Sequence, residues 1–195
     1  MRKGQTVANH LTRGVVTLCL LLFTALPVRA MTVYGVSVDN AVTMNGQTLQ
    51  LNGFGLRTKW FFKIYVGAFY VPQLIHTSAE AVRYQGDRLI RLHFVYSKVS
   101  RDKVLEALNE AFENNSPGFT GTADARQFRS WFSHDFLRGD QLDLALGADS
   151  SVVVTHNGRL LGSMISKPLQ AAIMRAFFGV YPADEALKRG MLGML

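Results

Sequence analysis

The chain has 195 residues, a formal net charge of +7 from 21 Lys and Arg against 14 Asp and Glu, and 48% hydrophobic residues. This length favours a single domain once any targeting segment is set aside. The basic residues are scattered rather than striped with aromatic residues, so we expect no nucleic-acid partner.

The first 30 residues have the pattern of a cleavable secretory signal peptide. Basic residues precede an apolar run at residues 15–26, and Val28 and Ala30 stand just before a cut at Met31. The run is shorter than the roughly 20 residues of a membrane span, so we expect no span after cleavage. The alternative is an uncleaved anchor. We therefore predict a mature domain at residues 31–195 that is periplasmic or secreted.

Cleavage also changes the charge and the cysteine content. It leaves 17 basic against 14 acidic residues, or +3, so the high charge of the full chain is partly a feature of export. The single cysteine, Cys19, lies within the signal, and Leu18 stands where a lipid attachment site needs a small residue. The mature domain is thus predicted to have no disulfide, and its length suffices to bury a core.

The first half of the mature chain reads as strands. Hydrophobic patterning predicts a leading strand around residues 33–38, a turn at Asn45-Gly46 and a short helix over 79–84 capped by Ser78. Between them come two consecutive strands, at 49–57 and 61–71. The second is apolar on both faces, which is typical of a central strand. Gly53 and Gly55 indicate a bulge or a close backbone approach.

Strands and helices are interspersed in the second half. A strand at 89–96 alternates, with Ile90, Leu92 and Phe94 on one face, and Asn157-Gly158 is the strongest hairpin signal in the chain. The other predicted strands are 141–146, 151–156 and 159–165. The predicted helices are 101–114 with Ser100 as cap, 123–132, 169–178 and 183–189. Together these elements predict an α+β fold built on an antiparallel sheet.

Two adjacent segments resemble the signature of the chalcone isomerase-like proteins, and above all their exported bacterial branch. They are Leu-Asn-Gly-Phe-Gly-Leu-Arg at residues 51–57 and the strand at 62–71; residues 157–162 and 178–190 match as well. The resemblance implies an open-faced β-sandwich, a large antiparallel sheet with a layer of helices on one face and a ligand cleft between them. Enzymes of the family close a flavanone ring there, whereas related plastid members bind fatty acids.

The resemblance also assigns site residues. The family's arginine, which stabilises a phenolate in the enzymes and holds a carboxylate in the lipid binders, falls on Arg57; the alternative is a paired or solvated strand-end arginine. The family's threonines fall on Tyr65 and Ala176, so most of the enzymatic hydroxyl set is missing. Tyr65 could donate a second hydrogen bond to a carboxylate, or be a plain core tyrosine.

Other residues are second-rank candidates for ligand binding. They are Tyr70, Tyr96 and Asn109, the last of which the resemblance aligns with the family's asparagine. Five phenylalanines could line the cleft or belong to the core: Phe61, Phe69, Phe94, Phe112 and Phe177. The histidines do not stand at metal-ligand spacing, and we expect neither a metal nor another cofactor.

Three functions remain open from the sequence. The first is a non-catalytic binding protein for a fatty acid or another small amphiphilic anion, with its carboxylate at Arg57. The second is an isomerase or intramolecular lyase acting on a phenolic or enone substrate, with Arg57 as electrophilic stabiliser. The third is an interaction protein whose cleft is filled by its own side chains.

Overall fold

A seven-stranded antiparallel sheet forms the centre of the fold. The computed structural model describes residues 30–194, so the predicted signal peptide, apart from Ala30, lies outside the described residues. The strand order is β11-β10-β9-β6-β5-β4-β3. The strands are β3 (Ala41–Met44), β4 (Gln47–Lys59), β5 (Phe62–Val71), β6 (Arg88–Phe94), β9 (Gln141–Leu146), β10 (Ser151–His156) and β11 (Arg159–Ile165). The predicted strand at 61–71 is indeed internal, between β4 and β6.

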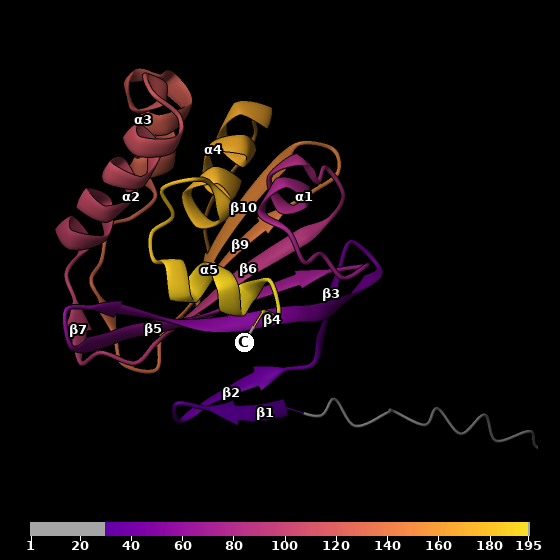
Figure 1. The fold of residues 1–195 in the computed structure, drawn as a ribbon. Coiled ribbons are helices and arrows are strands. Elements are labelled where there is room, and N and C mark those ends of the chain that lie inside the picture. The colour runs from indigo at the N-terminus through magenta and orange to yellow at the C-terminus, as the bar shows by residue number, and fades with distance from the viewer. Residues whose placement is uncertain (1–29, 195) are drawn as a thin grey trace, which may run out of the picture.

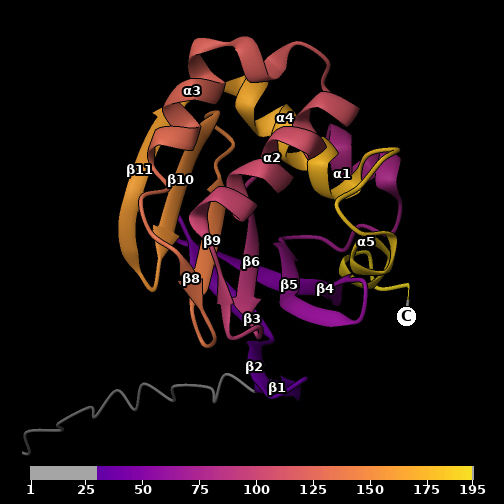
Figure 2. The same cartoon turned by 90° about the vertical axis from the view of Figure 1, so that its left-hand side faces the viewer.

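Helices cover one face of this sheet (Figures 1 and 2). They are α1 (Ser78–Arg83), α2 (Arg101–Asn115), the short 3-10 helix η1 (Phe119–Gly121), α3 (Ala123–Ser130), α4 (Lys167–Phe178) and α5 (Glu185–Met191). The main core lies between them and the sheet, where Ile90, Leu92 and Phe94 all point toward the helices as the alternation predicts. The α+β prediction is confirmed. Among the described residues, no helix is long and apolar enough to span a bilayer.

The opposite face of the sheet is partly covered by a separate hairpin. β1 (Ala30–Val33) and β2 (Val36–Asp39) pair with each other, and Val38 is buried in a small core with Val66, Tyr70 and Leu89. The prediction of one strand around residues 33–38 was wrong, because Tyr34 and Gly35 both adopt positive φ angles and reverse the chain. β7 (Lys98–Val99) and β8 (Phe136–Leu137) form a further two-stranded ladder.

Side-chain caps set the helix starts. Ser100 accepts from the Lys103 amide and caps α2, as predicted. α1 is instead capped by Thr77, which forms a capping box with Glu80, so the assignment of Ser78 was off by one residue. α5 begins two residues later than predicted because Asp184 is its cap, and α3 ends two residues earlier, at Ser130.

The C-terminal helix α5 lies directly on two glycines of β4. A Cβ atom at Gly55 would stand 2.5 Å from the backbone oxygen of Leu187, and one at Gly53 would meet the backbone oxygen of Gly190. The ladder between β4 and β5 also shifts register between Leu51 and Gly53. Both predictions for these glycines, a bulge and a close backbone approach, are therefore confirmed.

Candidate functional site

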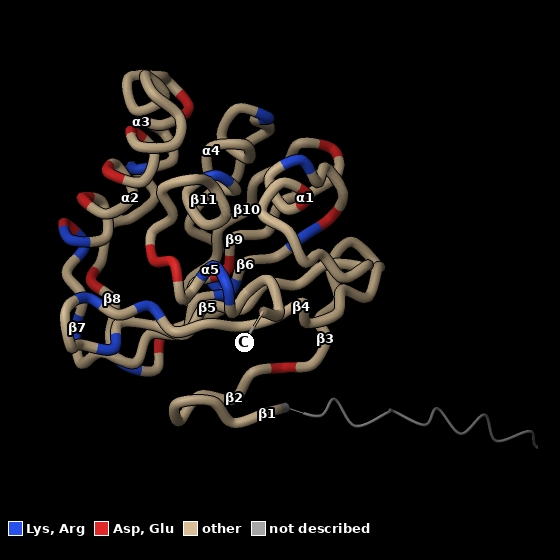
Figure 3. Tube along the Cα trace, viewed as in Figure 1, with Lys and Arg blue, Asp and Glu red and all other residues tan. Residues whose placement is uncertain are grey.

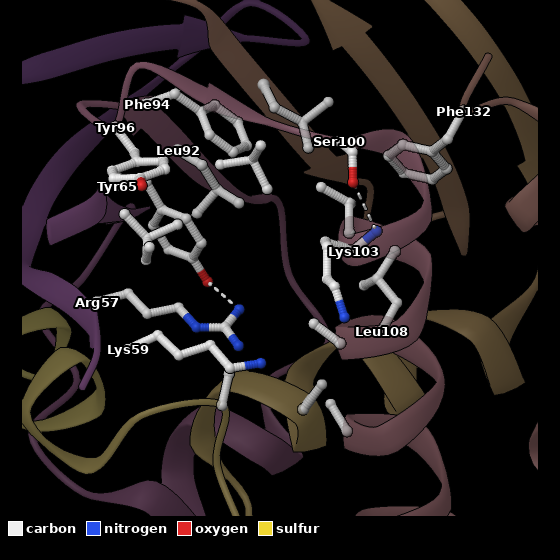
Figure 4. Close-up of a pocket in the computed structure, with 18 of the residues that line it drawn as sticks. Arg57, Lys59, Tyr65, Leu92, Phe94, Tyr96, Ser100, Lys103, Leu108 and Phe132 are labelled. Carbon is white, nitrogen blue, oxygen red and sulfur yellow. Dashed lines mark hydrogen bonds between the residues drawn. The ribbon is translucent and has the colours of Figure 1, made fainter. Parts of the chain in front are cut away.

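A cavity of about 490 Å³ lies between the sheet and helices α2, α3 and α4. This volume is within the range of about 300–1,000 Å³ that small-molecule sites occupy. The sheet contributes inward-facing residues of β4, β5, β6 and β9, and α2 contributes one of its faces (Figure 4). The position matches the cleft that the family resemblance implies.

Arg57 and Tyr65 form a polar pair in the cavity wall. They are direct partners in the ladder between β4 and β5. Arg57 donates from Nη1 to the Tyr65 hydroxyl oxygen at 3.4 Å, and its guanidinium lies 5.5 Å from the centroid of the Tyr65 ring. Because the tyrosine oxygen accepts this bond, its own O–H remains available to donate to a ligand. Figure 4 shows both side chains pointing into the same space.

The half-buried Arg57 has no carboxylate partner within ion-pair distance among residues 30–194. Asp184 is near enough to act on its charge but accepts from the Thr58 and Leu187 amides instead. The pKa of Arg57 lies above its ordinary value, since the interaction with Tyr65 raises it more than burial lowers it. The cavity wall thus holds a permanent cation that forms no ion pair with the described residues, although Asp184 and Glu110 are near enough to act on its charge.

The remainder of the cavity is lined mainly by apolar side chains. The central sheet supplies Ile64, Leu92, Phe94, Leu142 and Leu144, and Val99, Phe132 and Ala183 lie outside this sheet and the helices. The apolar lining residues of the helices are Val104, Ala107, Leu108, Ala111, Phe128, Ala176 and Phe177. Such a wall attracts a hydrocarbon chain and offers it few hydrogen-bonding groups.

Polar and cationic residues gather where α2 begins. Lys59 extends from the end of β4, and Lys103 lies across from it in the first turn of α2, where its backbone N–H donates to the hydroxyl of the cap Ser100 (Figure 4). Lys103 also pairs with Glu106, at 2.6 Å. Among residues 30–194, no group of three His, Cys, Asp or Glu side chains could hold a metal ion.

The structure brings three of the five predicted ligand-binding residues together. Arg57, Tyr65 and Tyr96 all line the cavity. Tyr70 points to the opposite face of the sheet and packs in the small core beneath the β1–β2 hairpin. Asn109 is not in the lining; its side-chain oxygen accepts from Arg129 of α3 at 3.2 Å.

The phenylalanines divide in the same way, and three lysines were missed. Phe94 and Phe177 line the cavity, Phe69 and Phe112 are core residues, and Phe61 is exposed. Lys59, Lys98 and Lys103 are lining residues that the sequence analysis did not predict as ligand contacts. A signal for Lys103 exists, because it shares a helical stripe with Val104, Ala107, Leu108 and Ala111, which are spaced at three and four residues.

The fold and the site together define an α+β protein with a binding cavity between its sheet and its helices. A model of the chalcone isomerase-like family matches residues 30–193, and the chain therefore belongs to this family.

One solved structure shows the likeness in three dimensions. The fold is similar to the crystal structure of a fatty-acid binding protein of Arabidopsis thaliana, with a TM-score of 0.64 and 18% sequence identity. The match covers 84% of this chain and 96% of that chain. No curated protein matches the chain in sequence.

Proposed function

We propose that this protein is a non-catalytic binding protein that holds a fatty acid or a similar amphiphilic anion in the cavity. The carboxylate lies against Arg57, which donates to it, and Tyr65 adds a second donor. We also propose that the protein belongs to the exported bacterial branch of the family and works in the periplasm or outside the cell. The observation that carries the proposal is Arg57, a cation at the wall of an apolar cavity that has no carboxylate partner within residues 30–194.

The remaining wall supports a hydrocarbon chain as the other half of the ligand. Each buried methylene contributes about 0.8 kcal/mol, which is about fourfold in affinity. A chain that fills the cavity therefore supplies most of the binding free energy, and Arg57 fixes its direction. The solved plant relative described above, a fatty-acid binding protein by name, supports the same ligand class.

The polar content of the lining supports binding rather than turnover. None of the described lining residues is a His, Asp, Glu or Cys, so the serines, tyrosines and lysines of the lining have no imidazole or carboxylate among the lining residues to activate them. Ala176 occupies the place of one of the family's threonines and lines the cavity without a hydroxyl. The open volume also argues against a cleft filled by the protein's own side chains.

Native mass spectrometry of protein purified from a periplasmic extract tests the proposal. We expect an intact mass that begins at Met31 and a bound ligand that denaturation releases as a fatty acid. Arg57→Ala should weaken the binding of cis-parinaric acid, a fluorescent fatty acid, by about tenfold to a hundredfold, because a hydrogen bond to a charged group is lost. Arg57→Lys keeps the charge but not the forked donor geometry, and should give an intermediate affinity.

A matched control separates the site from general effects of charge. Arg83 is an exposed arginine in the last turn of α1, away from the cavity lining. Arg83→Ala should bind like the parent protein. Protein that carries no lipid and does not bind added fatty acids, or equal losses in the Arg57 and Arg83 variants, would contradict the proposed function.

A further inference from the structure

The turn between β4 and β5 exposes three consecutive aromatic side chains, Trp60, Phe61 and Phe62. Their exposed fractions are 86%, 81% and 39%. Phe61 packs on Phe62 with ring centroids 4.4 Å apart, and Phe62 packs on Tyr96 at 5.3 Å. We call these three residues the aromatic tip. A contiguous apolar patch of this kind on a soluble domain marks an interaction surface.

The backbone conformation of the aromatic tip indicates that these residue types are not present because they favour the turn. Trp60 has a φ of +58°, a region that a bulky side chain rarely adopts. The comparable turns Asn45-Gly46 and Asn157-Gly158 use the residue pair that such turns favour. At residues 60–61 the chain instead keeps two large aromatic side chains in the solvent, against both turn preference and the hydrophobic effect.

The aromatic tip is continuous with the ligand cavity. Trp60 and Phe62 line an outer groove with four other residues: Lys59, Ile64, Tyr96 and Lys103. All four of these also line the cavity. An apolar chain that leaves the cavity at this end therefore passes directly over the aromatic tip.

Cations surround this end of the molecule. Lys59 and Lys63 flank the aromatic tip in sequence, and neither has an ion-pair partner in the described part of the chain. Lys98 and Lys103 lie in the cavity lining, where Asp135 and Glu106 partly offset their charge. Figure 3 shows Lys and Arg segments gathered around β7 and the adjoining end of β4 and β5. Anionic phosphates complement such a surface.

We propose that the aromatic tip docks on the surface of an anionic lipid bilayer, and that the cavity opens toward the lipid when it does. The indole and phenyl rings enter the interfacial layer, where aromatic side chains are favoured. Lys59 and Lys63 contact the lipid phosphates while their stems lie along the apolar layer. This inference extends the proposed function by giving the cavity a route for exchange of its ligand with a membrane.

Cosedimentation with vesicles tests docking without any bound fatty acid, so its outcome is independent of the ligand result. We expect the mature protein to bind mixed phosphatidylcholine–phosphatidylglycerol vesicles more tightly than pure phosphatidylcholine vesicles. Trp60→Ser with Phe61→Ser should weaken this binding by at least about tenfold. The matched control is Leu160→Ser with Ile165→Ser, which removes two exposed apolar side chains from the edge strand β11 and should leave binding unchanged.

A second pair of variants tests the charge. Lys63→Glu should reduce binding to the anionic vesicles by about fivefold or more, since each cation near such a surface contributes on that scale. Arg83→Glu, with the same change in net charge on α1, should not. Circular dichroism should show that all variants are folded.

Three results would overturn the proposal. The first is parent protein that remains in solution with anionic vesicles. The second is equal binding by the aromatic-tip variant. The third is a concentration-dependent dimer, abolished by the same variant and formed without any vesicle binding, which would assign the aromatic tip to a second copy of the chain.

Discussion

The two faces of the central sheet each carry an arginine beside a tyrosine, in opposite electrostatic settings. On the helix face, Arg57 contacts Tyr65 and has no carboxylate partner among the described residues. On the other face, Arg91 lies 5.8 Å from the ring centroid of Tyr70 and donates to both oxygens of Asp143 at 2.9 Å. A third bond, also 2.9 Å, joins Arg91 to Asp39 of β2.

Arg91 is thus a charge that stabilises the fold, whereas the charge of Arg57 remains available to an anion. Burial lowers the pKa of Arg91, but the bonds to Asp143 and Asp39 outweigh it, and the pKa lies above its ordinary value. These bonds join β6, β9 and the β1–β2 hairpin. Arg57 gains no such bond, so an anion from outside can supply what Asp143 supplies on the other face.

The largest expected effect is on stability, with Arg91→Ala compared against Arg57→Ala. Arg91→Ala leaves Asp143 partly buried without its partner and should lower the free energy of unfolding by about 3 kcal/mol. Arg57→Ala removes an unneutralised cation and should change it by less than about 1 kcal/mol. Urea unfolding at neutral pH measures both.

Replacing both members of the ion pair provides the control for this experiment. Arg91→Leu with Asp143→Leu should regain most of the stability that Arg91→Ala loses, because the charge that remains without a partner, Asp39, is exposed enough for water to solvate it. If Arg57→Ala were as destabilising as Arg91→Ala, Arg57 would be a structural residue and the comparison between the two faces would fail.

The next effect concerns Tyr70 at alkaline pH. Burial raises the pKa of Tyr70 to about 12, while a tyrosine in the unfolded chain titrates near pH 10. The unfolded state therefore loses its proton first. The contribution to stability is complete below about pH 10 and is lost as the pH rises through about 12, with about 1.4 kcal/mol gone at pH 11.

Tyr70→Phe removes this titration. Its hydroxyl has no hydrogen-bond partner among the described residues, so the variant should match the parent within about 0.5 kcal/mol at pH 7. Between pH 8 and pH 11 it should lose less stability than the parent, as urea unfolding at the two pH values would show. Parallel losses in both proteins would mean that Tyr70 is not the group that titrates.

The smallest expected effect is on ligand affinity at the helix face of the sheet. Tyr65→Phe removes the donor proposed for the ligand carboxylate and should weaken fatty-acid binding by about fivefold. Fluorescent displacement measures this change, and Tyr70→Phe serves as the matched control with unchanged affinity. The reverse result, with Tyr70→Phe weakening binding and Tyr65→Phe leaving it intact, would place the ligand on the other face of the sheet.

The regular parts of the fold could be predicted because local signals agree there. Alternating residues and the Asn157-Gly158 turn gave β9, β10 and β11 at their observed bounds. Tyr34-Gly35 was not recognised as a turn because apolar residues surround it. Lys59 was missed because its place in the cavity depends on how β4 faces α2, a non-local arrangement.

In the candidate site, too, the non-local arrangement of the residues could not be predicted from the sequence, with one exception. The resemblance identified Arg57 and Tyr65, but their pairing depends on a register shift between Arg57 and Thr58, where β5 carries an extra residue, Ile64. Tyr70, however, follows Tyr65 by five residues on one strand, and an odd spacing places two side chains on opposite faces. That rule alone is enough to separate the two tyrosines on the basis of their spacing in the sequence.

The packing of α5 against Gly53 and Gly55 has a consequence for the timing of the site's formation. The strand end that carries Arg57 is tied at Thr58 to Asp184, the cap of α5. Because synthesis proceeds from the N-terminus and distant contacts close late, we expect this end of β4 to be fixed only after the last helix has emerged. A nascent chain that ends before Asp184 already contains every strand of the central sheet, yet the strand end that carries Arg57 still lacks its contact with α5.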